Sequence, residues 1–438
     1  MKRLRARVFV LTLVAALAWV LLPASADAHH QISEAFDVKI GGFVQVNINW
    51  VSDEGVFDSD AGISTAVARG VAAEGRPTLR WTAKSTRLTL DVRGPEFLGA
   101  KSRAYIESDF ATSNKTGAEA SETPRLRRAF IRLPWPNVFM TLGQETMLLS
   151  RAVGTVSEIS TTLQGKGDRT GGTRNRSPKI LLGTTVPLGD MTLDLSAAAL
   201  RNNTDRASVG ATDEDSGSRS TRPAFEALAE LTVKNFLAFG RNATFAVSGY
   251  EGEEMLNNTG AAAASTGTKV ERRTENRALQ IETILPLGPA IPPLGAFEVR
   301  GGWYDAQNMD RVNLGNNAPR LGTGVQAGTV GDVASTGWWV EGNWYITKAL
   351  GIGGGTGEAN DGTADLRRLL ALTAASAVRH NEGWWVFANY TVGPLLTSLQ
   401  YMKVDTTRIY GSGAVNSPQT GRDTTDSSQV NLQFIYKF

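Results

Sequence analysis

The C-terminal stretch from Ser428 to Phe438, Ser-Gln-Val-Asn-Leu-Gln-Phe-Ile-Tyr-Lys-Phe, indicates the fold. Its side chains alternate between apolar and polar over most of its length, and successive side chains of a β-strand point to opposite faces. One face carries Val430, Leu432, Phe434, Tyr436 and Phe438, and the other carries Gln429, Asn431, Gln433 and Lys437. A strand with one apolar and one polar face crosses a membrane only within a closed barrel, where no backbone edge is left unpaired. The alternative is the edge strand of a soluble β-sandwich.

The N-terminus has the pattern of a secretory signal peptide. Four basic residues within the first seven positions precede an apolar run at 8–22, and Ala26-Asp27-Ala28 offers small residues for cleavage. The sequence therefore predicts a signal peptide at residues 1–28 and an exported barrel at residues 29–438. The apolar run is too short for a good transmembrane helix, and no later stretch reaches the roughly 18 uninterrupted apolar residues that such a helix requires.

The composition agrees with export. The 438 residues include no cysteine, so stability must come from backbone pairing and burial rather than from disulfide bonds. The 45 basic and 43 acidic residues leave a net charge of +2, so nucleic acid is not an expected partner. A mean hydropathy of −0.18 is too polar for a helical membrane protein, whereas a barrel hides its apolar band by alternation. No linker divides the mature chain, which we interpret as one domain.

Alternating segments recur along the whole mature chain and predict an all-β, antiparallel, up-and-down transmembrane barrel of about 16 strands. The predicted strands are 38–50, 80–93, 101–110, 125–133, 138–147, 178–186, 191–200, 223–234, 243–251, 273–285, 297–305, 336–346, 350–358, 383–391, 396–406 and the final segment. The segment 366–377 has a helical pattern but lies within a predicted loop. Closure of the barrel requires the first and last strands to be neighbours.

The connections between these strands sort by length. Short turns are expected at 94–100, 134–137, 187–190, 347–349 and 392–395. Long polar loops are expected at 51–78, 111–124, 148–177, 202–222, 252–272, 306–335, 359–382 and 407–427. Short periplasmic turns on one rim and long extracellular loops on the other are typical of outer-membrane barrels.

Few residues are suited to catalysis. Of the three histidines, His29 and His30 fall at the expected mature N-terminus and His380 falls in a predicted loop, so no predicted strand carries a histidine base. A Ser–His nucleophile is therefore not expected in the barrel. Two histidine ligands do not make a metal site, and no cofactor is expected.

Carboxylate pairs remain open as acid–base candidates. Glu107 with Asp109, or Glu226 with Glu230, would share a strand face. In a polar lumen such pairs are more often partners of basic residues than catalytic dyads. We therefore expect no enzymatic activity.

Charged residues on the inward faces of the first strands carry more information. Arg87, Arg93, Arg103 and Arg127 fall on adjacent predicted strands, with Asp91, Glu107 and Asp109 as expected partners. One interpretation is a structural ladder of ion pairs along the wall. The other is a transverse field, basic on one side of the pore, that orients anionic solutes. The two interpretations are compatible.

Several short segments together resemble the trimeric porins of proteobacteria, and in particular the DcaP-like group. They are Ile40-Gly41-Gly42-Phe43-Val44, Ser85-Thr86-Arg87-Leu88, Tyr105-Ile106-Glu107-Ser108-Asp109-Phe110, Leu126-Arg127-Arg128-Ala129-Phe130, Leu142-Gly143-Gln144 and the terminal Phe438. They cover the first third and the end of the chain. The helical extension that often precedes the barrel in the DcaP-like group has no counterpart in residues 29–35.

The resemblance implies a homotrimer in the lipid of a Gram-negative outer membrane that passes small hydrophilic solutes, preferably anions such as dicarboxylates. A strand ending in phenylalanine resembles the terminal strand that the barrel-insertion machinery recognises, which assigns that role to Phe438.

The third long loop, 148–177, occupies the position at which classical porins fold a loop back into the channel. It carries Arg151, Glu158, Lys166, Asp168, Arg169, Arg174 and Arg176. If this loop narrows the pore, its basic excess favours anions; the alternative is a plain extracellular loop.

Four functions are weighed. A barrel of about 16 strands leaves an aqueous lumen, which favours a passive diffusion channel. A receptor-transporter of about 22 strands would need a plug domain, for which the sequence has no candidate. A barrel enzyme is disfavoured by the missing strand histidine. The main alternative to the channel is a surface adhesin or receptor that binds its partner through the long loops.

Overall fold

The computed structural model describes residues 36–52, 56–58, 62–65, 75–110, 124–149, 175–202, 220–257, 271–288, 295–309, 314, 320–321, 330–372, 376–410 and 422–438. The strands of the main sheet are β1 (Asp37–Val51), β4 (Thr78–Thr82), β5 (Arg87–Phe97), β6 (Ala100–Asp109), β7 (Arg125–Pro134), β8 (Val138–Thr146), β9 (Arg176–Leu188), β10 (Met191–Leu200), β11 (Ala224–Val233), β12 (Ala243–Asn257), β13 (Glu271–Pro286), β14 (Ala296–Gln307), β17 (Ala334–Tyr345), β18 (Leu350–Asp361), β19 (Ser376–Val392), β20 (Leu395–Tyr410) and β21 (Arg422–Lys437).

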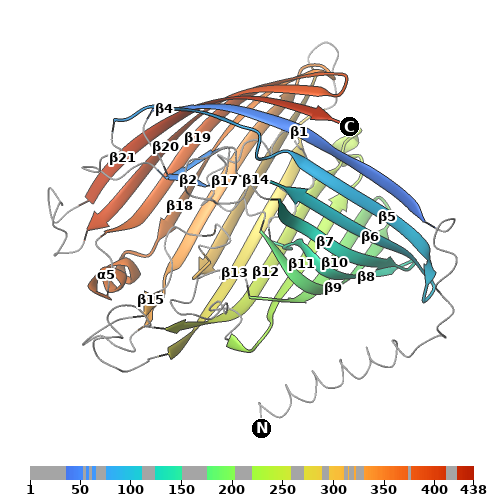
Figure 1. Cartoon of the computed structure of the whole chain (residues 1–438), viewed down its shortest axis with the longest axis horizontal. Helices are drawn as coiled ribbons and strands as arrows, with labels where there is room; N and C mark the ends of the chain where they lie inside the picture. Colours follow the sequence, from blue (N-terminus) through green and yellow to red (C-terminus); the bar gives the residue numbers. More distant parts are fainter. Residues whose placement is uncertain are drawn as a thin grey trace, which may run out of the picture.

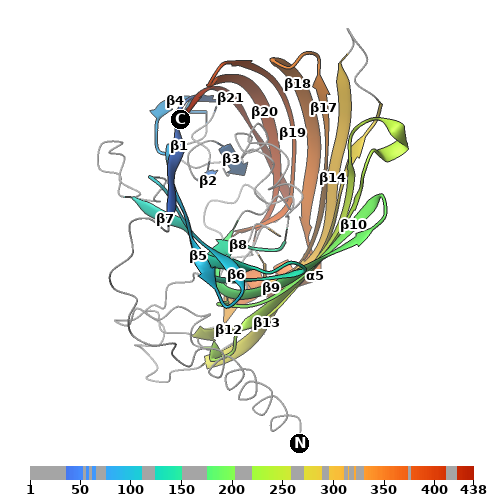
Figure 2. The same cartoon turned by 90° about the vertical axis from the view of Figure 1, so that its right-hand side faces the viewer.

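These strands form one closed antiparallel barrel (Figures 1 and 2). The sheet has 17 segments, but β4 and β5 share one position, because β4 pairs with residues 47–51 of β1 and β5 with residues 37–43. The ring therefore has 16 strand positions, as predicted. The seam is closed by β1 and β21, in the register Val44↔Tyr436 and Trp50↔Val430.

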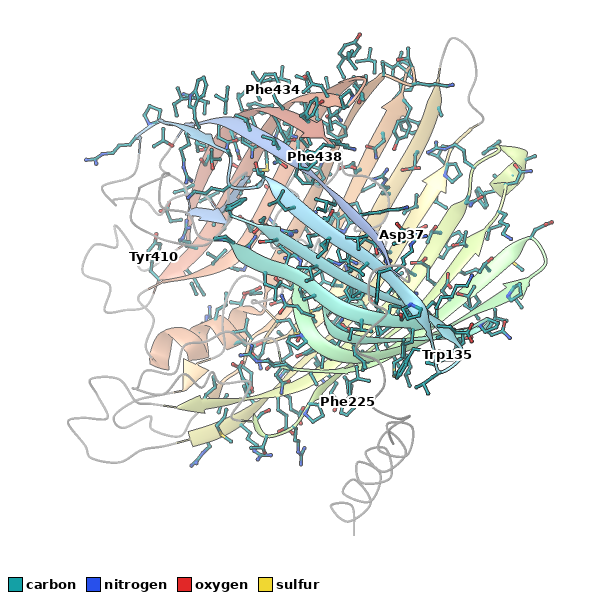
Figure 3. All side chains as sticks on the ribbon, turned by 45° about the vertical axis from the view of Figure 1, so that its right-hand side comes forward. Asp37, Trp135, Phe225, Tyr410, Phe434 and Phe438 are labelled. Carbon is teal, nitrogen blue, oxygen red and sulfur yellow. The ribbon has the colours of Figure 1, made fainter. Side chains whose placement is uncertain are left out.

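Alternation explains why these segments are strands with two distinct faces. On β1, Ile40 is 77% exposed on the outer face, whereas the lumen-facing Asn47 is fully buried. The same division holds around the ring, with large apolar side chains outside and amides, hydroxyls and charged groups inside. Figure 3 shows side chains standing on both faces, including Phe225 on β11 and Phe434 on β21. The outer face is the apolar band that a transmembrane barrel presents to lipid.

Several strand boundaries differ from the prediction. The segment 80–93 is interrupted between β4 and β5, and β5 continues to Phe97, so the turn predicted at 94–100 shrinks to Leu98 and Gly99. Both turn residues have positive φ, 52° and 73°, as a two-residue hairpin turn requires. Strand β19 begins at Ser376 rather than 383, which moves His380 from a predicted loop into a strand.

A short helix, α5 (Thr363–Leu372), fills part of the predicted loop between β18 and β19. Its Leu366 is buried against Val333 and Ala377 near the barrel rim. This packing explains why a helix forms here, although the last two residues of the segment 366–377 belong to β19 instead. Among the described residues, no helix is long and apolar enough to span a membrane.

The two rims differ as predicted. Gly189–Asp190 and Gly393–Pro394 are two-residue turns at the rim where the chain also ends, next to the start of β1. Residues 110–124, 147–175 and 201–223 are among the longer connections, which leave the opposite rim. Two connections on the short rim are longer than these turns, at 234–242 and 287–295, close to the bounds that the predicted strands left for them. The first contains the 3-10 helix η2 (Phe236–Ala238).

Candidate functional site in the barrel lumen

A cluster of ion pairs lines the lumen wall formed by β5 to β8. Arg127 Nε lies 2.6 Å from Glu107 Oε1, and Arg127 also binds Asp109. Arg87 Nε lies 3.5 Å from the same oxygen of Glu107. Of the residues named from the sequence, the structure therefore brings Arg87, Glu107, Asp109 and Arg127 together.

A β-bulge on β7 adds arginines that alternation did not predict. Glu107 pairs with Arg128 and Ser108 with Leu126, so Arg127 is the extra residue in the β6–β7 ladder. A bulge re-aims side chains, and here it lets the consecutive residues Arg127 and Arg128 both face Glu107. Arg128 Nη1 lies 3.8 Å from Glu107 Oε2.

The cluster is held by planar, two-point contacts. Arg128 Nε and Nη2 donate to the two carboxylate oxygens of Glu145 at 2.7 and 2.8 Å, and Arg125 contacts Asp109 in the same way at 2.9 and 2.8 Å. The guanidinium of Arg128 also lies 4.8 Å from the ring centre of Tyr105. Such forks fix guanidinium orientation more firmly than a point charge would.

The remaining sequence-predicted residues lie apart from this cluster. Arg103 forms a separate two-point pair with Asp91, at 2.7 and 2.9 Å. Arg93 is exposed toward the short-turn end of β5. The predicted loop residues Arg151, Lys166, Asp168, Arg169 and Arg174 fall outside the described part of the chain.

Arg176, at the start of β9, extends the cluster. It interacts electrostatically with Arg127 and Glu107, and its Nε is buried without a hydrogen-bond partner. Five arginines (87, 125, 127, 128 and 176) thus accompany three carboxylates (107, 109 and 145), which leaves an excess of two positive charges on this wall.

A second wall carries buried carboxylates. They are Glu226, Glu230, Glu254, Glu282, Glu298 and Glu341, on β11 to β14 and β17. Glu226 binds Lys179, and Glu298 binds Arg300 at 2.5 Å. Strand β17, which carries Glu341, lies half-way around the ring from β7 (Figure 2), and the other five glutamates lie on β11 to β14 between them. The pairing of Glu226 with Lys179 fits an ion-pair role better than an acid–base dyad with Glu230.

The third sector of the wall is uncharged. Gln433 Nε2 donates to Asn47 Oδ1 at 2.8 Å and Gln429 Nε2 to Asn49 Oδ1 at 3.0 Å, across the β1–β21 seam. These four amides are buried on the lumen side. The lumen therefore has a basic, an acidic and a neutral sector.

A small hairpin lies inside the ring next to the neutral sector. Strands β2 (Val56–Asp58) and β3 (Gly62–Thr65) pair with each other, and β3 lies against β20 and β21 (Figure 2). The lumen faces of β1, β17, β19 and β20 carry a buried apolar cluster, Val51, Trp339, Trp385, Phe387, Met402 and Val404. Apolar side chains on a lumen face gain stability only when they are covered. The sequence placed this hairpin in an ordinary extracellular loop.

The third long connection also enters the lumen where the structure describes it. The backbone N–H of Leu148 donates to the lumen-facing Glu226 at 2.8 Å. Leu149 is buried in a cluster that includes Tyr250 and Tyr304, on the inner faces of β12 and β14. The chain thus turns inward directly after β8, at the only residues of this loop's start that the structure describes, Leu148 and Leu149.

The terminal residue completes the seam. Phe438 N–H donates to the Gly42 carbonyl, and Gly42 N–H donates to the Phe438 carbonyl, both at 3.2 Å. Its ring is exposed on the outside. The role of Phe438 as an insertion signal stays a prediction.

One group of possible metal ligands lies on the outer face. Glu358, His380 and Glu382 place their ligand atoms within 4.8 Å of one another. His380 Nδ1 is 2.7 Å from Asn360 Oδ1 and its Nε2 is 3.3 Å from Glu382. Each ring nitrogen of His380 therefore already has a polar partner within the protein.

Comparison with known proteins gives a likeness in structure only. No protein-family model matches the chain, and no curated protein matches it. The outer membrane channel DcaP of Acinetobacter baumannii is similar over 95% of this chain and 100% of its own, with a TM-score of 0.65 and 19% identity. An anion-selective porin from Comamonas acidovorans covers 92% of this chain and 100% of its own, with a TM-score of 0.53 and 11% identity.

An outer membrane protein of Vibrio cholerae, OmpT, is similar at a TM-score of 0.52 and 10% identity, over 93% of this chain and 99% of its own. At these identities the likeness shows the fold. The chain folds as an outer-membrane β-barrel of the porin type, which confirms the fold expected from the sequence.

Proposed function

We propose that this protein is a passive channel of the Gram-negative outer membrane that admits small hydrophilic solutes and prefers anions, dicarboxylates among them. The proposal rests above all on the arginine cluster of β5 to β9. Its guanidinium groups are fixed in space and outnumber the carboxylates beside them. A fixed cationic wall lowers the free energy of an anion that leaves bulk water for the pore.

The carboxylates on the other part of the wall add an electric field across the pore to this preference for anions. A basic wall facing an acidic wall creates a field across the pore, which orients a solute that carries separated charges. A dicarboxylate that passes along the arginine wall exchanges part of its hydration for guanidinium contacts. The charged loop 148–177, with Arg151, Lys166, Asp168, Arg169 and Arg174, is proposed to contribute to the constriction because its first residues enter the lumen.

The proposed assembly is a homotrimer in outer-membrane lipid, as the resemblance to trimeric porins implies. Neither a cofactor nor an enzymatic activity belongs to the proposal. The cleavage of residues 1–28 as a signal peptide is part of it, since the barrel must be exported before it can insert.

A liposome-swelling assay tests the channel and its preference together. The purified protein should admit a small dicarboxylate faster than a neutral polyol of the same size. The double substitution Arg87→Gln with Arg128→Gln should slow the dicarboxylate and leave the polyol unchanged. Lys403→Gln is the matched control, because Lys403 pairs with Asp405 and Asp426 on the outer face.

Two results would contradict the proposal. Equal rates for both solutes in the wild type would remove the anion preference. Swelling with neither solute would remove the channel, and would favour the alternative of a surface adhesin or receptor that acts through the long loops.

A further inference from the structure

The barrel wall contains a basic cavity at the long-loop rim, between β7 and the β8–β9 pair. Strand β7 pairs with β8 only from Ala129 to Pro134, so its first four residues, 125–128, separate from β8. Gln144 bridges the gap by donating to the carbonyl groups of Leu126 and Arg127 at 3.1 and 2.8 Å. The gap leaves a cavity of about 260 Å³, which holds several water molecules or one phosphate group.

The lining of this cavity is strongly basic. It consists of Arg125, Leu126, Gln144, Asn175, Arg176, Ser177, Pro178, Arg201 and Asn202. Three of the nine residues are arginines, and none carries a carboxylate. The Nε of Arg176 is buried and has no hydrogen-bond partner in the structure, although a buried guanidinium donor normally has one. Asp109 already binds Arg125 from the lumen side, whereas the Nε of Arg176 has no such partner. This donor, in a cavity lined by three arginines, points to an anionic ligand.

The cavity reaches the lipid-facing side of the wall. Leu126 is 53% exposed on the outer face, and Pro178 shares its face of β9 with the exposed Ile180 and Leu182. Arg125, Arg176 and Arg201 all lie at strand ends on the long-loop rim. This level of the barrel meets the headgroups of the outer leaflet, where basic recesses between membrane segments recognise phosphorylated lipids.

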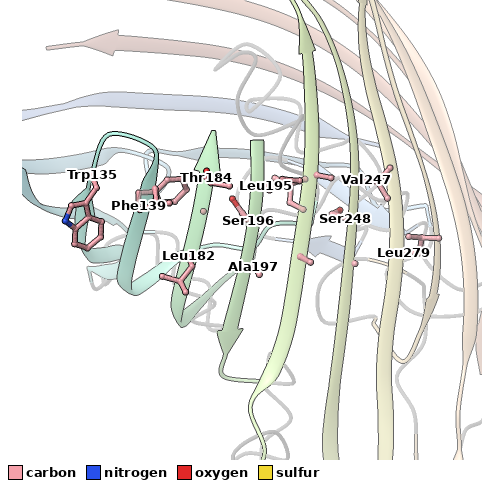
Figure 4. A pocket seen from close by; sticks show the side chains of 16 residues that line it. Trp135, Phe139, Leu182, Thr184, Leu195, Ser196, Ala197, Val247, Ser248 and Leu279 are labelled. Atoms are coloured by element: carbon pink, nitrogen blue, oxygen red, sulfur yellow. The ribbon is translucent and has the colours of Figure 1, made fainter. Parts of the chain in front are cut away.

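An apolar hollow lies farther along the same outer face. It is a cavity of about 770 Å³ whose lining includes Leu182, Leu195, Ala197, Ala229 and Leu279 (Figure 4). The hollow exists because small residues on β10 to β12 lie between larger ones on the flanking strands. Leu182 stands four residues from Pro178 along β9, a separation of roughly 13 Å. That is a suitable distance between a lipid headgroup and its acyl chains.

We propose that the outer face of β7 to β12 binds one phosphorylated lipid of the outer leaflet, with its phosphate in the basic cavity and an acyl chain in the apolar hollow. Guanidinium forks match phosphate oxygens, and Arg176 supplies the donor that lacks a partner. The apolar hollow contacts the acyl chain of the lipid, and a free phosphate ion has no such chain. The site shares Arg125 and Arg176 with the arginine wall of the pore, so its test measures lipid binding and not permeation.

Lipid retention by the full-length barrel tests the phosphate contact. The detergent-solubilised protein is incubated with a lipid that carries a phosphate monoester headgroup, or with its dephosphorylated counterpart, and examined by native mass spectrometry. Arg176→Gln should weaken binding of the phosphorylated lipid roughly tenfold, because a hydrogen bond to a charged group is lost. Arg367→Gln, an exposed arginine on α5 at the same rim, is the control and should bind as the wild type does.

Arg176→Lys keeps the positive charge but lacks the two-point guanidinium contact, so its affinity for the phosphorylated lipid should fall between those of the wild type and Arg176→Gln. This variant provides the test if Arg176→Gln does not fold. Equal retention of the two lipids by the wild type, or undiminished binding by Arg176→Gln, would overturn the phosphate assignment.

A second arm separates the lipid from free phosphate. Ala229→Phe fills the hollow and should weaken lipid binding, whereas Ala388→Phe, on the exposed face of β19, should not. Inorganic phosphate alone should bind much more weakly than the lipid. Equal affinity for both would overturn the lipid assignment. Dissociation of an oligomer by Ala229→Phe, with lipid binding intact, would show instead that a second copy of the chain fills the hollow.

Discussion

Gln429 on β21 donates its side-chain amide to Asn49 on β1 at 3.0 Å, across 380 positions of sequence. The bond lies on the lumen side of the seam where the last strand meets the first. Closure of this seam joins the two ends of the main sheet, so that the sheet has no terminal edge strand, as a β-sheet in lipid requires. Every functional argument about the lumen depends on this closure.

The seam register predicts a specific cross-link. Trp50 and Val430 are directly opposite each other, and the chain has no native cysteine to interfere. Trp50→Cys with Val430→Cys should form a disulfide on oxidation, because opposite residues in an antiparallel pair bring their Cβ atoms to roughly 4.5–5.5 Å. Electrophoretic mobility with and without reductant measures the bond. Trp50→Cys with Leu432→Cys, one pair out of register, should cross-link far less.

Two adjacent tryptophans on β19 separate the lumen face from the lipid face. Trp385 is 2% exposed and donates to Glu341 at 3.0 Å, whereas Trp384 is 43% exposed on the outer face. Trp385→Ala should lower the free energy of unfolding by about 3–5 kcal/mol, the usual cost of emptying a buried aromatic site. Trp384→Ala should cost less. Denaturant unfolding in lipid vesicles compares the two, and equal costs would contradict the inward apolar cluster.

The ion pairs around Glu107 predict opposite changes in selectivity. Glu107→Gln removes a negative charge from the arginine wall and should raise the permeability ratio of anion to cation. Arg127→Gln removes a positive charge beside it and should lower that ratio. Reversal potentials in planar bilayers measure both variants. Shifts of the same sign would contradict an electrostatic role for this wall.

The fork between Arg128 and Glu145 separates stability from selectivity. Arg128→Lys keeps the charge but loses the two-point contact, so the free energy of unfolding should fall by roughly 1.5–3 kcal/mol. The reversal potential should stay at the wild-type value. A shifted potential with unchanged stability would show that the geometry of the fork, and not its charge, sets the preference.

The β2–β3 hairpin predicts a change in conductance. Replacement of residues 56–65 by a short Gly/Ser linker should raise single-channel conductance, because the hairpin lies inside the ring. A matched replacement of the turn 235–241, on the short rim between β11 and β12, should leave conductance unchanged. Unchanged conductance in the hairpin variant would show that the hairpin does not restrict the ion path.

Most of the barrel was predictable from sequence because membrane strands must alternate. The period of two predicted the faces of β1 and β21 and the pairing of the two ends of the chain. It also brought Arg87, Glu107 and Asp109 to the lumen side.

What alternation missed were departures from period two and contacts between distant segments. The bulge at Arg127 shifts the face of the residues before it, so Arg125 and Arg128 were not recognised as neighbours of the same carboxylates. The inward position of β2 and β3 is a contact of β3 with β20 and β21, which lie far away in the sequence. No local pattern around residues 56–65 predicts such a contact.

The reversal potential of the wild-type channel in a salt gradient tests the central claim most directly. A planar bilayer separates two concentrations of potassium chloride, and the potential at zero current gives the ratio of chloride to potassium permeability. The arginine wall predicts a value on the chloride-selective side. A potassium-selective value, or the absence of any current through correctly folded protein, would contradict the account.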